Sequence, residues 1–195
     1  MDEKYNLLRK SFGDHRLKLN EPLRHHAYSR PAALAEAFYI ATSAYELTQI
    51  LDAAYELGLP YQVFGAGTKV VFPNPKLHGV VIKNRTAGIK IGAVKGKVGR
   101  EGIGVEEALV EADSGVSLAR LNEFLSRQNL VGVSSPSLIE STLGSLVRFD
   151  AAVQSLVQKI RVWERGRVEE VALSQLRNGQ IILSIILKVK SQSLS

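Results

Sequence analysis

The sequence predicts an α+β protein made of two strand–helix units in series. First, a strand candidate at residues 36–41 precedes a capping box, in which Ser43 and Glu46 can each satisfy an unpaired amide at a helix start. Second, the same order recurs later, with a strand-like segment at 108–112 and a helix beginning at Ser117. Third, the remainder is rich in strand-like segments separated by turns. Together these features favour a mixed fold over an all-helical one.

Composition limits the function before any motif is considered. The chain has 195 residues, of which 45% are apolar, so it can build a core without disulfides. It contains no cysteine, which excludes thiol catalysis and thiolate metal sites. It has no apolar run of about 18 residues and no signal-like start, so we expect a cytoplasmic protein without membrane insertion. The net charge of +6 favours phosphate-bearing ligands.

The first unit begins after a peripheral segment. Residues 2–19 suit a short helix, and a turn is expected at Asn20-Glu21-Pro22. The helix that begins at the capping box carries apolar residues at helical spacing and should end near Leu57, because Gly58 and Pro60 follow. Three strands are then expected, at 61–64, 70–72 and 80–83.

The second unit follows a glycine-rich stretch. Residues 92–104 contain so many glycines that we expect a mobile loop or a hairpin tip. The helix from Ser117 should bury one apolar face. The C-terminal part should form strands at 159–164, 168–173 and 180–190, with turns at Arg165-Gly166-Arg167 and Asn178-Gly179.

The glycine turn between the first strands is the best local candidate for a binding site. It reads Phe64-Gly65-Ala66-Gly67-Thr68-Lys69, and two glycines allow the backbone to approach a pyrophosphate and direct amides toward it. It lacks the third glycine and the following helix of a Rossmann fingerprint. On the local pattern alone, we favour a tight strand connection that needs positive backbone dihedrals.

The basic glycine-rich stretch offers a second candidate. It does not match a P-loop, because the spacing is one residue short and no Ser or Thr follows Lys97. Gly96-Lys97-Val98-Gly99 has the form of an RNA-clamping Gly-x-x-Gly loop, with Lys95 and Arg100 nearby. The alternative, which we favour, is a solvated hairpin tip whose charge protects an exposed edge.

Other chemistry has little support. The adjacent His25 and His26 have no helical partner at i+3 or i+4, so no zinc site is expected. The sequence has no nucleophile elbow of the Gly-x-Ser-x-Gly type. Trp163, on an alternating strand, is expected to pack in the core or at an edge.

Four segments, taken in order, resemble the family of the flavoenzyme UDP-N-acetylenolpyruvoylglucosamine reductase, also called UDP-N-acetylmuramate dehydrogenase. They are 64–69, 79–82, 114–116 and 138–145, and the resemblance runs from about Asn20 to Val189. It implies two packed α+β subdomains of the vanillyl-alcohol-oxidase or PCMH-type FAD-binding fold, with FAD between them. The implied organisation is a peripheral segment, two FAD-binding subdomains and a tail, at 1–19, 20–84, 85–190 and 191–195.

The resemblance also implies which residues bind FAD. The family holds the pyrophosphate on the glycine turn and on a second segment. The turn usually ends in Ser-Asn, where this chain has Thr68-Lys69, and the second segment has lost two of the family's three glycines and carries Glu140. The implied cofactor-binding residues are Phe64, Gly65, Ala66, Gly67, Thr68, Lys69, Ser141, Thr142, Gly144 and Ser145.

Catalysis is not assigned to any residue. The family's arginine motif matches Arg177 without the flanking tyrosine and serine, and its third, substrate-binding domain is not represented. We therefore expect an FAD-binding protein of peptidoglycan precursor synthesis that is weakly active or inactive alone; a separate chain that supplies the substrate domain is a further alternative. The alternative is a cofactor-free interaction module whose basic loop binds an acidic partner or RNA, although nucleic acid is not the partner we favour.

Overall fold

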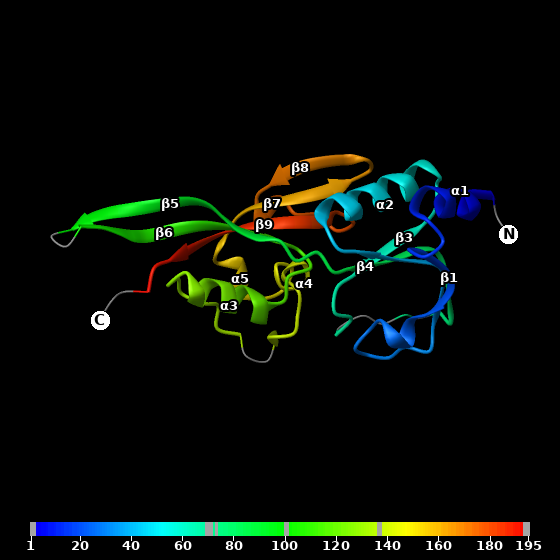
Figure 1. The fold of residues 1–195 in the computed structure, drawn as a ribbon, viewed down its shortest axis with the longest axis horizontal. Helices are drawn as coiled ribbons and strands as arrows, with labels where there is room; N and C mark the ends of the chain where they lie inside the picture. Colours follow the sequence, from blue (N-terminus) through cyan, green and yellow to red (C-terminus); the bar gives the residue numbers. More distant parts are fainter. Residues whose placement is uncertain (1–2, 69–71, 73, 100–101, 136–137, 193–195) are drawn as a thin grey trace. The chain divides into compact units, whose positions relative to one another are not determined.

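The structure is a computed structural model that describes residues 3–68, 72, 74–99, 102–135 and 138–192 (Figure 1). Residue contacts divide the chain into two compact units. Unit 1 comprises Met1–Thr86 and Trp163–Arg167, and unit 2 comprises Ala87–Val162 and Val168–Ser195. Each unit combines a sheet with helices. The predicted α+β class is confirmed.

Unit 1 contains a four-stranded sheet in the order β1, β2, β4, β3. Strand β1 runs antiparallel to β2, whereas β2, β4 and β3 are mutually parallel. The parallel arrangement requires a crossover between β2 and β3, and helix α2 provides it. The bounds are Leu17–Pro22 for β1, Leu34–Ala41 for β2, Ala44–Glu56 for α2, Tyr61–Phe64 for β3 and Lys76–Asn84 for β4.

Helix α2 forms where the capping box predicts it. The Ser43 hydroxyl accepts a hydrogen bond from the Glu46 amide at 3.2 Å, which satisfies one of the unpaired amides of the first turn. Its buried residues recur at helical spacing and pack against the three parallel strands: Leu47, Ile50, Leu51 and Ala54. The apolar stripe of the sequence is therefore the face that covers the sheet.

In unit 1, one expected turn is absent, one expected strand falls partly outside the described chain, and the strand expected at 80–83 is present but begins earlier. Helix α1 (Glu3–Phe12) matches the peripheral helix, but β1 continues through the turn expected at Asn20-Glu21-Pro22 and pairs with β2 as far as Pro22. Asn20 accommodates this with a left-handed φ of 51°. Of the strand expected at 70–72, residues 70 and 71 are not described, and Phe72 lies outside any strand. Strand β4 begins before the expected residue 80, at Lys76.

The opposite face of this sheet is covered by irregular chain. The segment after β1, which includes the short 3₁₀ helix η1 (Leu23–His25), lies across the sheet from α2 (Figure 1). Leu23, Ala27 and Ala33 from this segment form a core cluster with sheet residues, including Phe38 and Val81. Irregular structure can therefore cover a sheet face when its apolar side chains are buried against it.

Unit 2 contains a five-stranded sheet in the order β5, β6, β9, β7, β8, with three helices packed against it. The strands are β5 (Ile89–Gly99), β6 (Gly102–Asp113), β7 (Val157–Glu164), β8 (Arg167–Val171) and β9 (Ile181–Lys190). The helices are α3 (Leu118–Arg127), α4 (Leu143–Leu146) and α5 (Ala151–Gln154). The helix and strands predicted after residue 108 are present, with shifted ends.

The glycine-rich stretch is not a mobile loop. Residues 92–99 and 102–104 belong to the long antiparallel hairpin of β5 and β6, whose register runs from Ile89 opposite Ala112 to Gly99 opposite Gly102. Of the two alternatives, the hairpin is confirmed for these residues and the mobile loop is wrong, because a two-stranded ladder is held by backbone hydrogen bonds, which do not require side chains. Register shifts at Ile91/Ala93 and Lys95/Gly96 interrupt the pairing without ending it.

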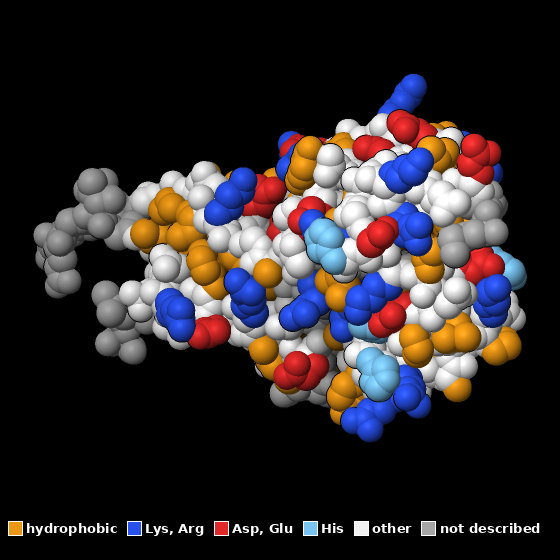
Figure 2. Space-filling view, turned by 45° about the vertical axis from the view of Figure 1, so that its right-hand side comes forward, with side chains coloured by type: hydrophobic (Ala, Val, Ile, Leu, Met, Phe, Trp, Pro, Cys, Tyr) orange, Lys and Arg blue, Asp and Glu red, His pale blue; other side chains and the backbone are white. Residues whose placement is uncertain are grey.

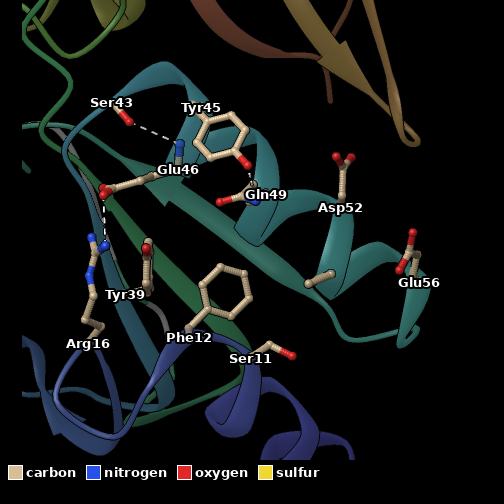
Figure 3. Close-up of a pocket in the computed structure, with 11 residues that line it drawn as sticks. Ser11, Phe12, Arg16, Tyr39, Ser43, Tyr45, Glu46, Gln49, Asp52 and Glu56 are labelled. Atoms are coloured by element: carbon tan, nitrogen blue, oxygen red, sulfur yellow. Dashed lines mark hydrogen bonds and ion pairs between the residues drawn. The ribbon is translucent and has the colours of Figure 1, made fainter.

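An ion pair connects the start of β1 to helix α2 (Figure 3). Arg16 Nη1 lies 2.8 Å from Glu46 Oε1, and the guanidinium sits 5.1 Å from the centre of the Tyr39 ring. The other Glu46 oxygen accepts hydrogen bonds from the Thr42 amide and hydroxyl at 2.9 and 2.8 Å. The Arg16 hydrogen bond is the largest cause that lowers the pKa of Glu46 to about 2.

The tip of the β7–β8 hairpin belongs to unit 1, where it packs on helix α2. Trp163 is fully buried, and its indole Nε1 donates a hydrogen bond to Asp52 Oδ1 at 2.6 Å. The ring makes edge contacts with Tyr55 and Tyr61, with centroids 6.1 and 5.4 Å away. The packing role predicted for Trp163 is confirmed.

We expect Trp163→Phe to lower the apparent free energy of unfolding by about 1–3 kcal/mol, because it removes a buried hydrogen bond and part of an aromatic cluster. Urea titration followed by circular dichroism measures this change. A double-mutant cycle with Asp52→Ala isolates the hydrogen bond, and a coupling energy of zero would show that the bond contributes nothing.

We expect Glu46→Gln to reduce the loss of stability in acid. A carboxyl whose pKa is lower in the folded state stabilises the fold above its unfolded value, near 4.5, and this contribution is lost as pH falls toward about 2. After solvent screening it should be up to about 2 kcal/mol. Thermal melts at pH 2.5 and pH 6 should differ less for the variant than for the wild type, whereas the exposed Glu56→Gln control should match the wild type.

Candidate functional site

The candidate site is an open cavity of about 1010 Å³ in unit 1. It lies where the segment after η1 meets the loop after β3. Blue and pale-blue side chains, which mark Lys, Arg and His, are frequent on the face drawn in Figure 2. Among the described residues that line the cavity none is acidic, and they are Arg24, His25, His26, Ala27, Tyr28, Arg30, Ala66 and Lys83. Such a lining favours an anionic ligand.

The glycine turn after β3 forms one wall of this cavity. Phe64 anchors the turn, because its side chain is 4% exposed and belongs to the core cluster below the segment. Gly67 has a left-handed φ of 71°, and a Cβ atom there would lie 2.6 Å from Ala27 Cβ and 2.8 Å from Ala27 Cα. Glycine is therefore required for both backbone conformation and space.

The turn presents amides that no other described residue uses. The carbonyl oxygens of Ala66 and Gly67 accept hydrogen bonds from the amides of Tyr28 and Ser29, at 3.2 and 3.3 Å. Within the described chain, the amides of Ala66, Gly67 and Thr68 donate to no other residue. Successive amides around a left-handed residue form a nest that binds anions. Lys69 lies outside the described residues.

The two histidines of the cavity are held by protein contacts. His26 Nε2 lies 2.7 Å from Glu21 Oε1, and its ring packs against Phe38 with centroids 4.1 Å apart. His25 Nε2 accepts a hydrogen bond from Arg24 Nε at 3.0 Å. No group of three His, Cys, Asp or Glu residues that could hold a metal ion occurs among the described residues.

The second predicted segment lies in unit 2 and has few amides to offer. The amides of Ser141, Leu143, Gly144 and Ser145 all donate to backbone carbonyls, at 2.8 to 3.0 Å. A Cβ atom on Gly144 would lie 2.9 Å from Ser114 Cβ, so this glycine allows close packing. Ser141 and Thr142 are buried, whereas Ser145 is half-buried. Any ligand contact from this segment depends mainly on side-chain hydroxyls.

Sequence reasoning located the turn but missed the cations around it. Arg24, Arg30 and Lys83 belong to no motif, and the topology brings them to one cavity. Lys83 carried a signal, because it directly follows the apolar run Val80-Val81-Ile82 within β4, where a charge is costly to bury. The exposed Arg177 lies in unit 2, and its amide donates to Gln180 Oε1 at 2.9 Å.

Comparison with known families identifies this architecture. The model of a family described as FAD binding domain matches residues 35–152, which include both predicted binding segments. The chain belongs to this family of FAD binding domains. Membership supports a flavin as the cofactor and confirms the resemblance drawn from the sequence.

Curated relatives and solved structures agree with this membership. UDP-N-acetylenolpyruvoylglucosamine reductase 2 of Symbiobacterium thermophilum is 25% identical, with 83% of this chain aligned to 50% of that protein. The reductase of Clostridioides difficile is 23% identical, covering 89% of this chain and 59% of its own length. The chain therefore spans about half the length of these curated relatives.

Two solved structures show the shared fold. The Thermus caldophilus UDP-N-acetylenolpyruvylglucosamine reductase has a TM-score of 0.62 at 17% identity and covers 90% of this chain and 62% of its own. An alkyldihydroxyacetonephosphate synthase has a TM-score of 0.68 at 16% identity, and the match covers 98% of this chain and 39% of the synthase chain. The FAD-binding fold expected from the sequence is confirmed. Within the described ranges, no helix has the length and hydropathy needed to cross a membrane.

We expect Gly67→Ala to destabilise the protein more than Gly179→Ala. Both glycines have a left-handed φ, 71° and 92°, but a Cβ on Gly179 meets nothing within 4 Å. Gly179→Ala should therefore cost about 1 kcal/mol from backbone strain, and Gly67→Ala about 2–4 kcal/mol because Ala27 must also move. Equal losses in thermal denaturation would contradict the close contact.

Proposed function

We propose that this chain binds FAD and forms the cofactor half of a reductase-like protein. The observation that carries the proposal is the turn at 65–68, whose spare amides lie beside a cavity lined by cations and by no carboxylate in the described chain. A pyrophosphate group matches both features, because it accepts several hydrogen bonds and carries negative charge. The family match supports a flavin dinucleotide as the source of that group.

The proposed contacts fall on the two segments named from the sequence. Phe64, Gly65, Ala66, Gly67, Thr68 and Lys69 would hold the pyrophosphate, chiefly through backbone amides. Ser141, Thr142 and Ser145 would assist, chiefly through hydroxyl groups, and Gly144 would assist through its small size, since four amides of that segment are already engaged. When bound, FAD would supply hydride-transfer chemistry, and the protein would supply position and electrostatics.

The proposed reaction rests on the curated relatives and not on a site in this chain. The curated relatives are UDP-N-acetylenolpyruvoylglucosamine reductases, so a role in peptidoglycan precursor synthesis is the natural expectation. Because the chain matches about half of those proteins, we propose that these 195 residues are weakly active or inactive alone and that a substrate-binding part outside them completes the activity. We assign no catalytic residue, and we propose no catalytic role for Arg177.

The alternative of a cofactor-free interaction module is not favoured. Its basic residues would be Lys95, Lys97 and Arg100, but Lys95 Nζ lies 3.6 Å from Glu106 Oε2, which offsets part of its charge. The side chain of Lys97 and the whole of Arg100 lie outside the described structure. The family match covers both predicted binding segments and does not depend on this module.

The proposal is tested by flavin binding to the purified protein. We expect a flavin absorption band between 300 and 550 nm after reconstitution, and saturable quenching of FAD fluorescence. Ala66→Asp should weaken FAD binding at least tenfold, because a carboxylate at the cavity wall repels phosphate. Ala66→Asn, of the same shape but neutral, should bind far more tightly than Ala66→Asp. Absence of FAD binding by the folded wild type would overturn the proposal.

A further inference from the structure

Lys83 is a half-buried cation at the end of a parallel strand. On β4 it lies opposite Phe64 of β3 and Ile40 of β2, near the carboxyl ends of the three parallel strands. Two residues earlier on the same strand face, Val81 belongs to the core cluster beneath the segment after η1. The Lys83 side chain therefore extends from that core to the cavity, which it lines.

No negative charge in the described chain compensates Lys83. It forms no ion pair or hydrogen bond with another described residue. The other charged or titratable groups of the cavity are Arg24, His25, His26, Tyr28 and Arg30, none of which is a carboxylate. Burial, and secondarily the charge of Arg85, lowers the pKa of Lys83. An uncompensated buried cation is costly unless a ligand supplies the missing charge.

We propose that Lys83 is the charge partner of the flavin's diphosphate and the main determinant of the protein's preference for a ligand that carries one. This inference rests on the proposed FAD-binding function and adds a specific residue to it. The turn amides provide hydrogen bonds but no full charge, and the second segment has four amides already engaged. The ammonium group at the same cavity as Ala66 supplies the formal charge that a diphosphate needs.

The test compares Lys83→Met with Lys10→Met. Both variants remove one positive charge from unit 1, but Lys10 is exposed on α1 and does not line the cavity. Three probes separate the parts of the ligand: FAD, ADP, which retains the diphosphate, and riboflavin, which lacks it. Isothermal titration calorimetry gives each dissociation constant at two salt concentrations.

We expect Lys83→Met to raise the dissociation constants of FAD and ADP at least tenfold and to leave that of riboflavin within twofold of the wild type. It should also reduce the salt dependence of FAD binding. Lys10→Met should stay within twofold of the wild type for all probes. The melting temperature of the ligand-free Lys83→Met variant should equal or exceed that of the wild type, because a half-buried unpaired charge is removed. Lys83→Gln repeats the test with a polar neutral side chain if the methionine variant does not fold.

The outcomes distinguish the two proposals. If the wild type binds neither FAD nor ADP, the proposed function fails. If the wild type binds both and Lys83→Met binds them equally well, the role of Lys83 is overturned while FAD binding stands. An equal loss for riboflavin would show that Lys83 has a structural role, and it would also overturn the inference.

Discussion

The close approach of Gly67 to Ala27 is the constraint on which the binding region of unit 1 depends. A side chain at residue 67 would overlap the backbone of the segment after η1, so the turn and that segment can meet only because the residue is glycine. The contact lets Tyr28 and Ser29 donate to the carbonyls of the turn. These bonds satisfy the carbonyls of the turn. The amides of Ala66, Gly67 and Thr68 donate to no other described residue, so they can donate to a ligand.

In the proposed site, charge and hydrogen bonding would make separate contributions to ligand binding. Backbone amides give direction but little net charge, whereas Lys83 and the arginines give charge. Elsewhere in unit 1 a strong charge is satisfied internally, as Arg16 pairs with Glu46 at 2.8 Å. Lys83 has no such partner among the described residues, and this contrast supports the proposal that the cavity binds an anion.

Unit 2 uses its glycines for other purposes. Gly144 permits close packing against Ser114, and the glycines of β5 and β6 lie in a backbone ladder. The two predicted binding segments therefore differ in what they can offer a ligand, because three amides of the turn donate to no other described residue, whereas four amides of the second segment are engaged. Hydrogen-bond partners reveal this difference, which the presence of glycine and hydroxyl residues in both segments does not.

The sequence by itself determined the α+β class, helix α2 with its Ser43 cap, and the turn at 64–69, because each follows from local rules of capping, periodicity and turn chemistry. Tertiary structure decided the rest. Whether residues 92–104 form a loop or a ladder depends on pairing between strands, and β1 runs through Asn20 because β2 lies beside it. Lys83 is far in the chain from Arg24 and Arg30, and only the fold brings the three cations to one cavity, since β4 carries Lys83 and the segment that follows β1 carries the exposed arginines.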